Sequence, residues 1–152
     1  MAFEGAILRT IATFLESLDI PVRETRITHE TLVPGVDIHD GGLIVDEPQL
    51  LRQADILHEG GHIAIMPRTL RRELYGTISS TPAQEVSCIA WTWAAALHLG
   101  IPPEEVFHEQ VISGNGPTLL DNFSNGRYVG VPLLRKWGMT IEYPRMLRWT
   151  ID

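Results

Sequence analysis

The chain has 152 residues, of which 44% are hydrophobic, and its 19 acidic and 12 basic side chains give a formal net charge of −7. A chain of this length buries roughly two-thirds of the surface that its unfolded form exposes, so we expect one domain over residues 1–152 that needs no metal ion or disulfide to fold. No run of five or six basic residues offers a binding surface for a phosphate backbone, and nucleic acid is therefore not an expected partner.

Cysteine usage and hydropathy indicate the cellular environment. Cys88 is the single cysteine, which excludes an intramolecular disulfide framework and a cysteine-rich zinc module. No apolar run approaches the length of about 20 residues that spans a bilayer. Glu4, Arg9 and Glu16 interrupt the apolar residues of the N-terminus, so no signal peptide is predicted. We expect a soluble, cytoplasmic protein with no membrane partner.

The first part of the chain predicts one helix and two short strands. Apolar residues recur at helical spacing from Phe3 to Leu18 and predict an amphipathic helix that ends before Pro21. Residues 22–27 (VRETRI) are too polar to be buried on both faces and predict an edge strand. Residues 28–42, rich in proline and glycine, predict a loop or hairpin connection, and Leu43–Val45 predicts a short apolar strand.

A helix is predicted from about Pro48 to Met66. Two acidic residues precede Pro48, which is a typical helix start, and Pro67 prevents continuation. One side of this helix is a predicted core stripe, with two histidines at its border: Leu50, Ala54, Leu57, Gly61 and Ala64, beside His58 and His62.

A second helix is predicted from the capping-box pattern at residues 81–84 (TPAQ) to about Leu99, where Gly100 stops it. After it we expect a short helix at 103–111, a loop at 113–117 (SGNGP) and a helix within 131–139 (VPLLRKWGM). These elements indicate an α+β fold: a small, mostly antiparallel sheet packed on the helix over 48–66, with the second helix beside it.

The sequence HEGGH at 58–62 indicates a metal site. Residues at i and i+4 stand one turn apart on the same side of a helix, so the imidazoles of His58 and His62 can reach one ion. A catalytic zinc ion has three protein ligands and a water molecule, and a glutamate directly after the first histidine can exchange that water's proton. Glu59 has this place. The alternative is that two histidines fell one turn apart by chance.

Glu85 is the best placed third ligand. It lies in the first turn of the second helix, from which its carboxylate can point at the ion if the two helices pack side by side. An acidic residue in a first turn is also favoured by the helix dipole, so a purely structural role stays open. Ile65 and Arg68 stand where metzincins continue the motif with glycine and histidine, which excludes that class.

From about Gly42 to Leu97 the chain resembles the gluzincin side of the zincin metallopeptidases. The resemblance rests on a strand (GGLIVDE), the HEGGH helix and a helix with the glutamate (QEVSCIAWTWAAAL), and it is closest to short bacterial zincins of the ImmA/IrrE type. It implies a minimal zincin domain, with His58, His62 and Glu85 as zinc ligands and Glu59 as general base. Gly60 and Gly61 weaken a helix, and we expect them to let a neighbouring element approach closely.

The expected function is zinc-dependent hydrolysis of amide bonds in a peptide or protein. Two alternatives stay open: a zincin-fold binding or regulatory module without turnover, and a metal hydrolase acting on another substrate. Peptide deformylases take a cysteine ligand from before the metal helix, whereas Cys88 follows it. The sequence leaves the substrate, the physiological ion and the oligomeric state undetermined.

Other basic residues are expected to be structural or solvent-exposed. His39 lies in a predicted turn, His98 in the last turn of a helix and His108 on an exposed helix. The arginines at 68, 71 and 72 could attract a substrate carboxylate, but a solvated face is the favoured interpretation.

Overall fold

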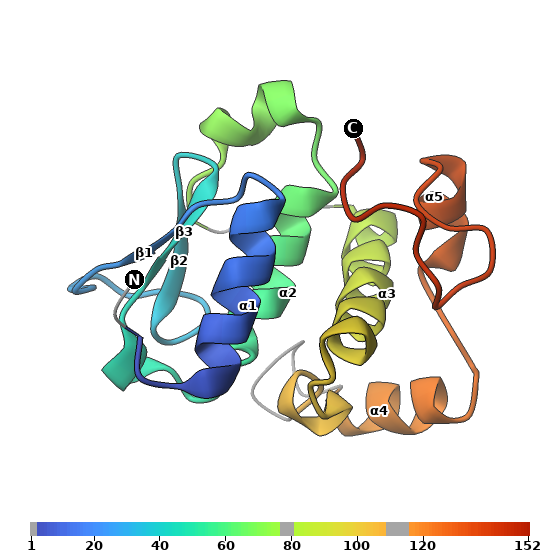
Figure 1. Cartoon of the computed structure of the whole chain (residues 1–152), viewed down its shortest axis with the longest axis horizontal. Coiled ribbons are helices and arrows are strands. Elements are labelled where there is room, and N and C mark those ends of the chain that lie inside the picture. The colour runs from blue at the N-terminus through green and yellow to red at the C-terminus, as the bar shows by residue number, and fades with distance from the viewer. Residues whose placement is uncertain (1–2, 77–80, 109–115) are drawn as a thin grey trace.

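The computed structural model of the protein describes residues 3–76, 81–108 and 116–152 (Figure 1). Over these residues the chain forms, in order, α1 (Ala6–Ser17), β1 (Val22–Glu24), β2 (Val36–His39), β3 (Gly42–Val45), the 3₁₀ turn η1 (Glu47–Gln49), α2 (Asp55–Ala64), η2 (Arg68–Glu73), α3 (Pro82–Leu99), η3 (Pro103–Glu105), α4 (Gly116–Ser124) and α5 (Val131–Lys136). The expected α+β class is confirmed.

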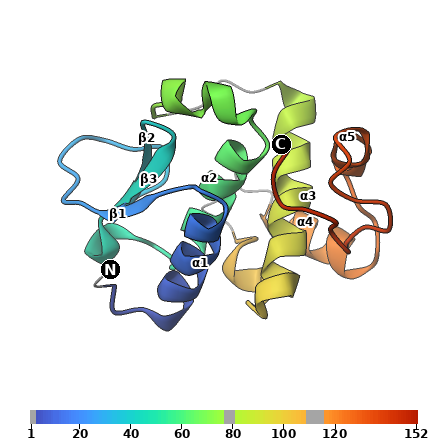
Figure 2. The same ribbon diagram turned by 45° about the horizontal axis from the view of Figure 1, so that its top comes forward.

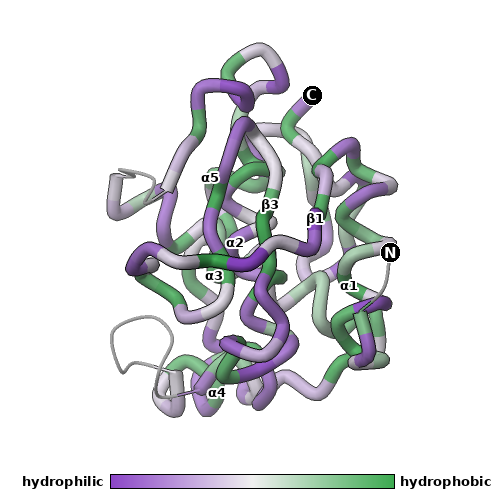
Figure 3. The backbone as a smooth tube through the Cα atoms, turned by 90° about the vertical axis from the view of Figure 1, so that its left-hand side faces the viewer, coloured by the Kyte–Doolittle hydropathy of each residue, from purple (hydrophilic) through white to green (hydrophobic). Residues whose placement is uncertain are grey.

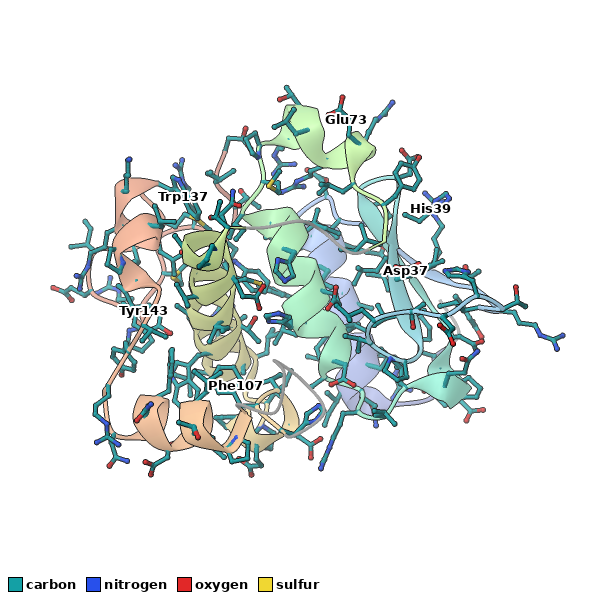
Figure 4. All side chains as sticks on the ribbon, turned by 180° about the vertical axis from the view of Figure 1, so that it is seen from behind. Asp37, His39, Glu73, Phe107, Trp137 and Tyr143 are labelled. Carbon is teal, nitrogen blue, oxygen red and sulfur yellow. The ribbon has the colours of Figure 1, made fainter. Side chains whose placement is uncertain are left out.

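The elements are arranged in layers with α2 near the middle. The sheet lies on one side, α1 and α2 come next, α3 follows, and α4 and α5 lie beyond α3 (Figures 1 and 2). Figure 4 shows Asp37 and His39, both on β2, on the opposite side of the molecule from Trp137 and Tyr143. Because α2 contacts β2, β3, α1 and α3, each of its residues except Glu59 is buried.

The sheet has the strand order β1-β3-β2 and is mixed. β2 and β3 are antiparallel, whereas β1 runs parallel to β3, with Val22 opposite Leu43. The prediction of a mostly antiparallel sheet was therefore wrong. Asp40 and Gly41 both have positive φ and make the tight turn between β2 and β3. The long connection from residue 25 to residue 35 lets the chain pass from β1 to β2 at the far edge of β3.

Helix α1 confirms the predicted amphipathic pattern. Its buried residues recur at helical spacing, and Figure 3 shows hydrophobic and hydrophilic residues alternating along it. The helix has no side-chain cap of its own. The Glu47 carboxylate accepts hydrogen bonds from the backbone N–H groups of Glu4 and Gly5, both at 2.9 Å, and Gln53 Oε1 accepts one from Leu8 N–H at 3.0 Å. A distant segment thus satisfies N–H groups at the start of α1.

The same contacts explain why the helix predicted over 48–66 is divided. The chain makes the short turn η1, becomes extended at Leu50, and begins α2 only at Asp55. Glu47, interpreted as part of the helix start, instead caps α1. Propensity within the segment favours one helix, but the contacts with α1 require the chain to turn before residue 55.

Helix α3 forms as predicted. Thr81 and Gln84 make a reciprocal capping box, and Gly100 ends the helix in the left-handed conformation. Its middle, from Ser87 to Ala96, is buried on all sides because α3 packs against both α2 and α5. The two indoles point in different directions. Trp91 packs on Phe14 and Trp149, and Trp93 packs on Phe107 and Phe123.

The C-terminal part contains one helix that the sequence did not predict. Helix α4 begins at Gly116, inside the expected loop at 113–117, whose residues 113–115 lie outside the described residues. Of the helix expected at 103–111, the structure has η3, and residues 109–111 again lie outside the described part. Helix α5 confirms the helix predicted in VPLLRKWGM. Among the described residues no helix is both long and apolar enough to cross a bilayer.

Gly60 and Gly61 allow the close helix packing that was expected of them. A Cβ atom on Gly61 would lie 2.8 Å from Trp91 Cε3 and 2.9 Å from Cys88 Sγ, both on α3. On Gly60 it would lie 2.5 Å from Cδ2 of Leu15 on α1. Helix α2 therefore approaches two neighbours at distances that no side chain at these positions permits.

We expect Gly61→Ala to destabilise the protein. Alanine gains about 1 kcal/mol in helix propensity, but overpacking a core typically costs about 1–3 kcal/mol, and the fully buried Trp91 indole has no free space. Contacts of 2.8 and 2.9 Å place the overpacking cost in the upper part of this range, so denaturant unfolding should show a net loss of about 1–2 kcal/mol. Gly60→Ala is the matched comparison: its Cβ would meet the branched end of Leu15, which can change rotamer more easily than the Trp91 indole can move, so it should cost less. A Gly61→Ala protein as stable as wild type would contradict the packing argument.

Candidate metal centre

The two histidines of HEGGH lie where α2 faces α3. His58 and His62 are one turn apart and only 7% and 9% exposed, so both are more deeply buried than the border position expected. Their ring centroids are 4.8 Å apart and the rings are nearly perpendicular, at 84°. In this arrangement both imidazoles can present Nε2 to one point between the helices.

Glu85, in the first turn of α3, lies at that point. Its Oε1 is 3.2 Å from Nε2 of His58, and its Oε2 is 3.3 Å from Nε2 of His62. Ligand atoms about 2.0–2.1 Å from a tetrahedral zinc ion are about 3.3 Å apart, so these distances match the spacing of ligands around one ion. The structure thus brings together the three residues predicted as ligands.

Cys88, one turn further along α3, is a second candidate ligand. Its Sγ lies 3.7 Å from Nδ1 of His58. Ligand atoms of His58, His62 and Cys88 lie within 4.8 Å of one another, and these three buried residues could hold a metal ion. Sγ is also 3.3 Å from the backbone oxygen of His58, to which a thiol can donate.

The two candidate ligand sets differ at His58. Glu85 faces Nε2, and Cys88 faces Nδ1. Thr92 Oγ1 donates to the backbone oxygen of Cys88 at 2.8 Å and lies 3.4 Å from Nδ1 of His58. Its Oγ1 can therefore accept a hydrogen bond from Nδ1–H of His58, and in this tautomer the Nε2 lone pair is free on the side of Glu85. This orientation favours the set with Glu85.

The interpretation of the sequence missed Cys88 and Thr92, although a signal was present. Glu85, Cys88 and Thr92 are spaced three and four residues apart, so they lie on one face of a helix. That face is the one turned to α2. The sequence alone does not show which side of α3 packs against α2.

The four candidate ligand side chains shift one another's pKa values strongly. Hydrogen bonds from His58 and then from His62 hold the pKa of the Glu85 carboxyl well below its usual range. Burial would lower the pKa of His62, but the charge of Cys88 and the hydrogen bonds with Cys88 and Glu85 raise it to about 10. The same balance raises the pKa of His58 well above its usual value. Burial would raise the pKa of the Cys88 thiol, but the charges of the two histidines lower it to about 7.

These shifts show that the side chains between α2 and α3 favour a positive charge there. In the metal-free protein the protons on the imidazoles supply that charge beside the Glu85 carboxylate. A divalent cation supplies the same charge, and its binding must release those protons. The donor atoms, imidazole nitrogen with carboxylate or thiolate, suit zinc and related transition metals.

Glu59 differs from the rest of α2. It is half-buried, and no hydrogen bond or ion pair connects its carboxylate to another of the described residues. Its negative charge still contributes to the raised pKa of His58. Its carboxylate is free of hydrogen bonds to the described residues and lies near the two candidate ligand histidines, so it is available to accept a proton.

A buried ion pair holds the start of α2. His108 Nε2 lies 2.6 Å from Oδ1 of Asp55, and both side chains are almost fully buried. The expectation that His108 is exposed was wrong. Burial raises the pKa of Asp55, and the hydrogen bond with His108 opposes this shift. His39 and His98 are exposed and lie outside the metal centre, as expected.

Comparisons of this chain with family models, curated proteins and solved structures found no match. Its function is therefore argued from the chemistry of the site.

We expect metal affinity to rise with pH. Protonated imidazoles compete with the ion, so a lower pH favours the metal-free form. Each displaced proton should change the apparent affinity by up to about tenfold per pH unit between about pH 6 and 9. Zinc titration calorimetry in buffers of different ionisation enthalpy measures both affinity and proton release. An affinity independent of pH would contradict the predicted competition.

Cobalt binding should distinguish the two ligand sets. We expect Glu85→Gln to weaken binding by at least about tenfold, because it removes the carboxylate that faces both Nε2 atoms. The exposed Glu104→Gln, with the same chemical change, should bind like wild type. Cys88→Ser should change affinity less than about threefold, and wild type should lack a sulfur-to-cobalt charge-transfer band. A strong band that Cys88→Ser abolishes would instead identify Cys88 as a ligand.

Proposed function

We propose that the protein is a zinc-dependent hydrolase of the zincin type that cleaves amide bonds in peptides or proteins. His58, His62 and Glu85 hold the ion, and Glu59 is the general base. The observation that carries this proposal is the spacing of Glu85 from both Nε2 atoms, 3.2 and 3.3 Å, next to a glutamate with no structural partner among the described residues. A reducing compartment suits the single, unpaired cysteine.

The geometry of the three candidate ligand residues supports this role. A bound zinc ion lowers the pKa of a water molecule and polarises a carbonyl group. The protein supplies the geometry: α2 presents the two imidazoles, α3 presents the carboxylate, and Thr92 orients His58 through its Nδ1 side. Burial excludes bulk water from the histidines and so strengthens their electrostatic interactions.

Glu59 exchanges the proton that hydrolysis requires. Its carboxylate takes a proton from the attacking water and returns it to the leaving amine nitrogen, so that the glutamate is restored at the end of the reaction. Two observations support this role: Glu59 is half-buried on a helix that is otherwise buried along its length, and its charge acts on His58.

A second candidate is a binding or regulatory module without turnover. The proximity of Cys88 to both histidines favours it, because His58, His62 and Cys88 are three buried candidate ligands and one further protein ligand would close their site to water. Structural zinc sites are closed in this way, whereas catalytic sites keep one position for water. A site with three protein ligands and one position for water would also allow hydrolysis of a substrate other than a peptide.

Glu59→Gln should separate an enzyme from a module. The amide keeps the size of the side chain but cannot accept a proton, so zinc content should persist. Turnover of a fluorogenic peptide library should fall by at least about 10²-fold, a typical contribution of general-base catalysis. Glu73→Gln, an exposed residue of η2 (Figure 4), is the matched control and should keep full activity.

Three results would count against the proposal. Wild type that contains zinc but cleaves no peptide in the library would support the module instead. Equal activity of Glu59→Gln and wild type would exclude Glu59 as the base. Wild type that binds no zinc when offered it would remove the basis of both candidates.

A further inference from the structure

A second polar site lies at the corner of the molecule where η2 meets the turn between β2 and β3. It is a hollow of about 400 Å³, and it is lined by Asp19, Pro21, Arg23, Asp40, Gly41, Arg68, Arg71 and Arg72. Glu73 on η2 and His39 at the end of β2 mark this corner in Figure 4. None of the lining residues belongs to the metal centre. Four arginines gather here although the whole protein has a net charge of −7.

Arg71 is the buried member of this group. Arg71 is only 5% exposed, and its Nη1 donates a hydrogen bond to the backbone oxygen of Leu18 at 3.0 Å. Its Nε and Nη2 atoms are also buried, but they have no hydrogen-bond partner among the described residues. The expectation of a solvated arginine face was therefore wrong at Arg71. Arg23, Arg68 and Arg72 are exposed.

The unpaired edge of Arg71 has the geometry of an anion receptor. In a planar guanidinium the N–H bonds of Nε and Nη2 on this edge are parallel, so they bind two oxygens of one carboxylate or phosphate group. A buried charged donor that lacks its acceptor costs free energy, because it has lost its hydrogen bonds to water without gaining others. A negatively charged oxygen ligand would remove this cost.

Two of the nearby acidic residues, Asp19 and Asp152, are engaged with Arg68. Asp19 Oδ2 lies 2.7 Å from Nη1 of Arg68, and the Asp152 carboxylate accepts from Arg68 N–H at 3.1 and 3.3 Å. Burial, and then the positive charge of Arg68, lower the pKa of Arg71, which the charges of Asp152 and Asp19 only partly oppose. The hollow thus lacks negative charge at Arg71 in particular.

We infer that this hollow binds a small molecule through a dianionic oxyanion, with a phosphate monoester as the chemical class that fits best. The phosphate lies among the exposed side chains of Arg23 and Arg72, and a small movement of the buried Arg71 side chain brings its unpaired edge to two of the phosphate oxygens. Four arginines and two aspartates line the hollow, which leaves a net charge of +2 to match a dianion. The volume exceeds that of a phosphate ion and is typical of small-molecule sites.

Titration of the full chain with inorganic phosphate tests this inference. The titration is run with EDTA, so that a metal ion cannot be the receptor, and acetate at the same ionic strength serves as the monoanion. We expect one saturable phosphate site, with acetate at least about tenfold weaker. Arg71→Lys keeps the charge but removes the paired donors, and should weaken phosphate binding by about tenfold or more.

Exposed variants keep the test decisive if Arg71→Lys fails to fold. Arg23→Gln and Arg72→Gln should each weaken phosphate binding by about three- to tenfold, and Arg135→Gln, an exposed arginine of α5, by less than about twofold. Phosphate that binds no better than chloride, or that binds all four variants alike, would overturn the inference. Acetate that binds as well as phosphate would overturn the preference for a dianion. Because EDTA is present, these outcomes are independent of hydrolysis at the metal centre.

Discussion

The close contact between α2 and α3 is the constraint on which the metal centre depends. Without a side chain at Gly61, the Trp91 indole and the Cys88 thiol of α3 pack directly on the backbone of α2. At this separation a carboxylate in the first turn of α3 reaches both imidazoles of α2, at 3.2 and 3.3 Å. A larger residue would separate the helices and with them the ligands. Gly61, which is unfavourable for a helix, is thus required by the geometry of the site.

Burial of α2 explains why its polar residues are paired, with one exception. Asp55 contacts His108, and the two histidines contact Glu85, because a charged group away from water needs a partner of opposite charge. Glu59 alone is half-exposed and has no such partner among the described residues. A carboxylate without a structural contact beside a polarised pair of imidazoles is the arrangement expected for proton transfer.

Arg71 shows the opposite situation, since its charge is buried but only partly paired. It comes shortly after α2 in the chain, on η2, and lies outside the metal centre. The two sites differ in the sign of the charge that would complete them. The metal centre presents donor atoms that suit a cation, and the hollow around Arg71 presents donors that suit an anion. Each deficit points to a ligand of defined charge rather than to a role in folding.

The sequence by itself determined the elements whose signals lie within a few residues: the amphipathic pattern of α1, the capping box and glycine stop of α3, and the HEGGH spacing. The tertiary structure decided what depends on contacts between distant segments. Glu47 caps α1 and so divides the predicted helix, β1 pairs in parallel with β3, and α4 forms in an expected loop. Cys88 reaches His58, and Arg71 becomes buried, only through packing. Periodicity and capping are local, whereas burial and the choice of partner are properties of the assembled core.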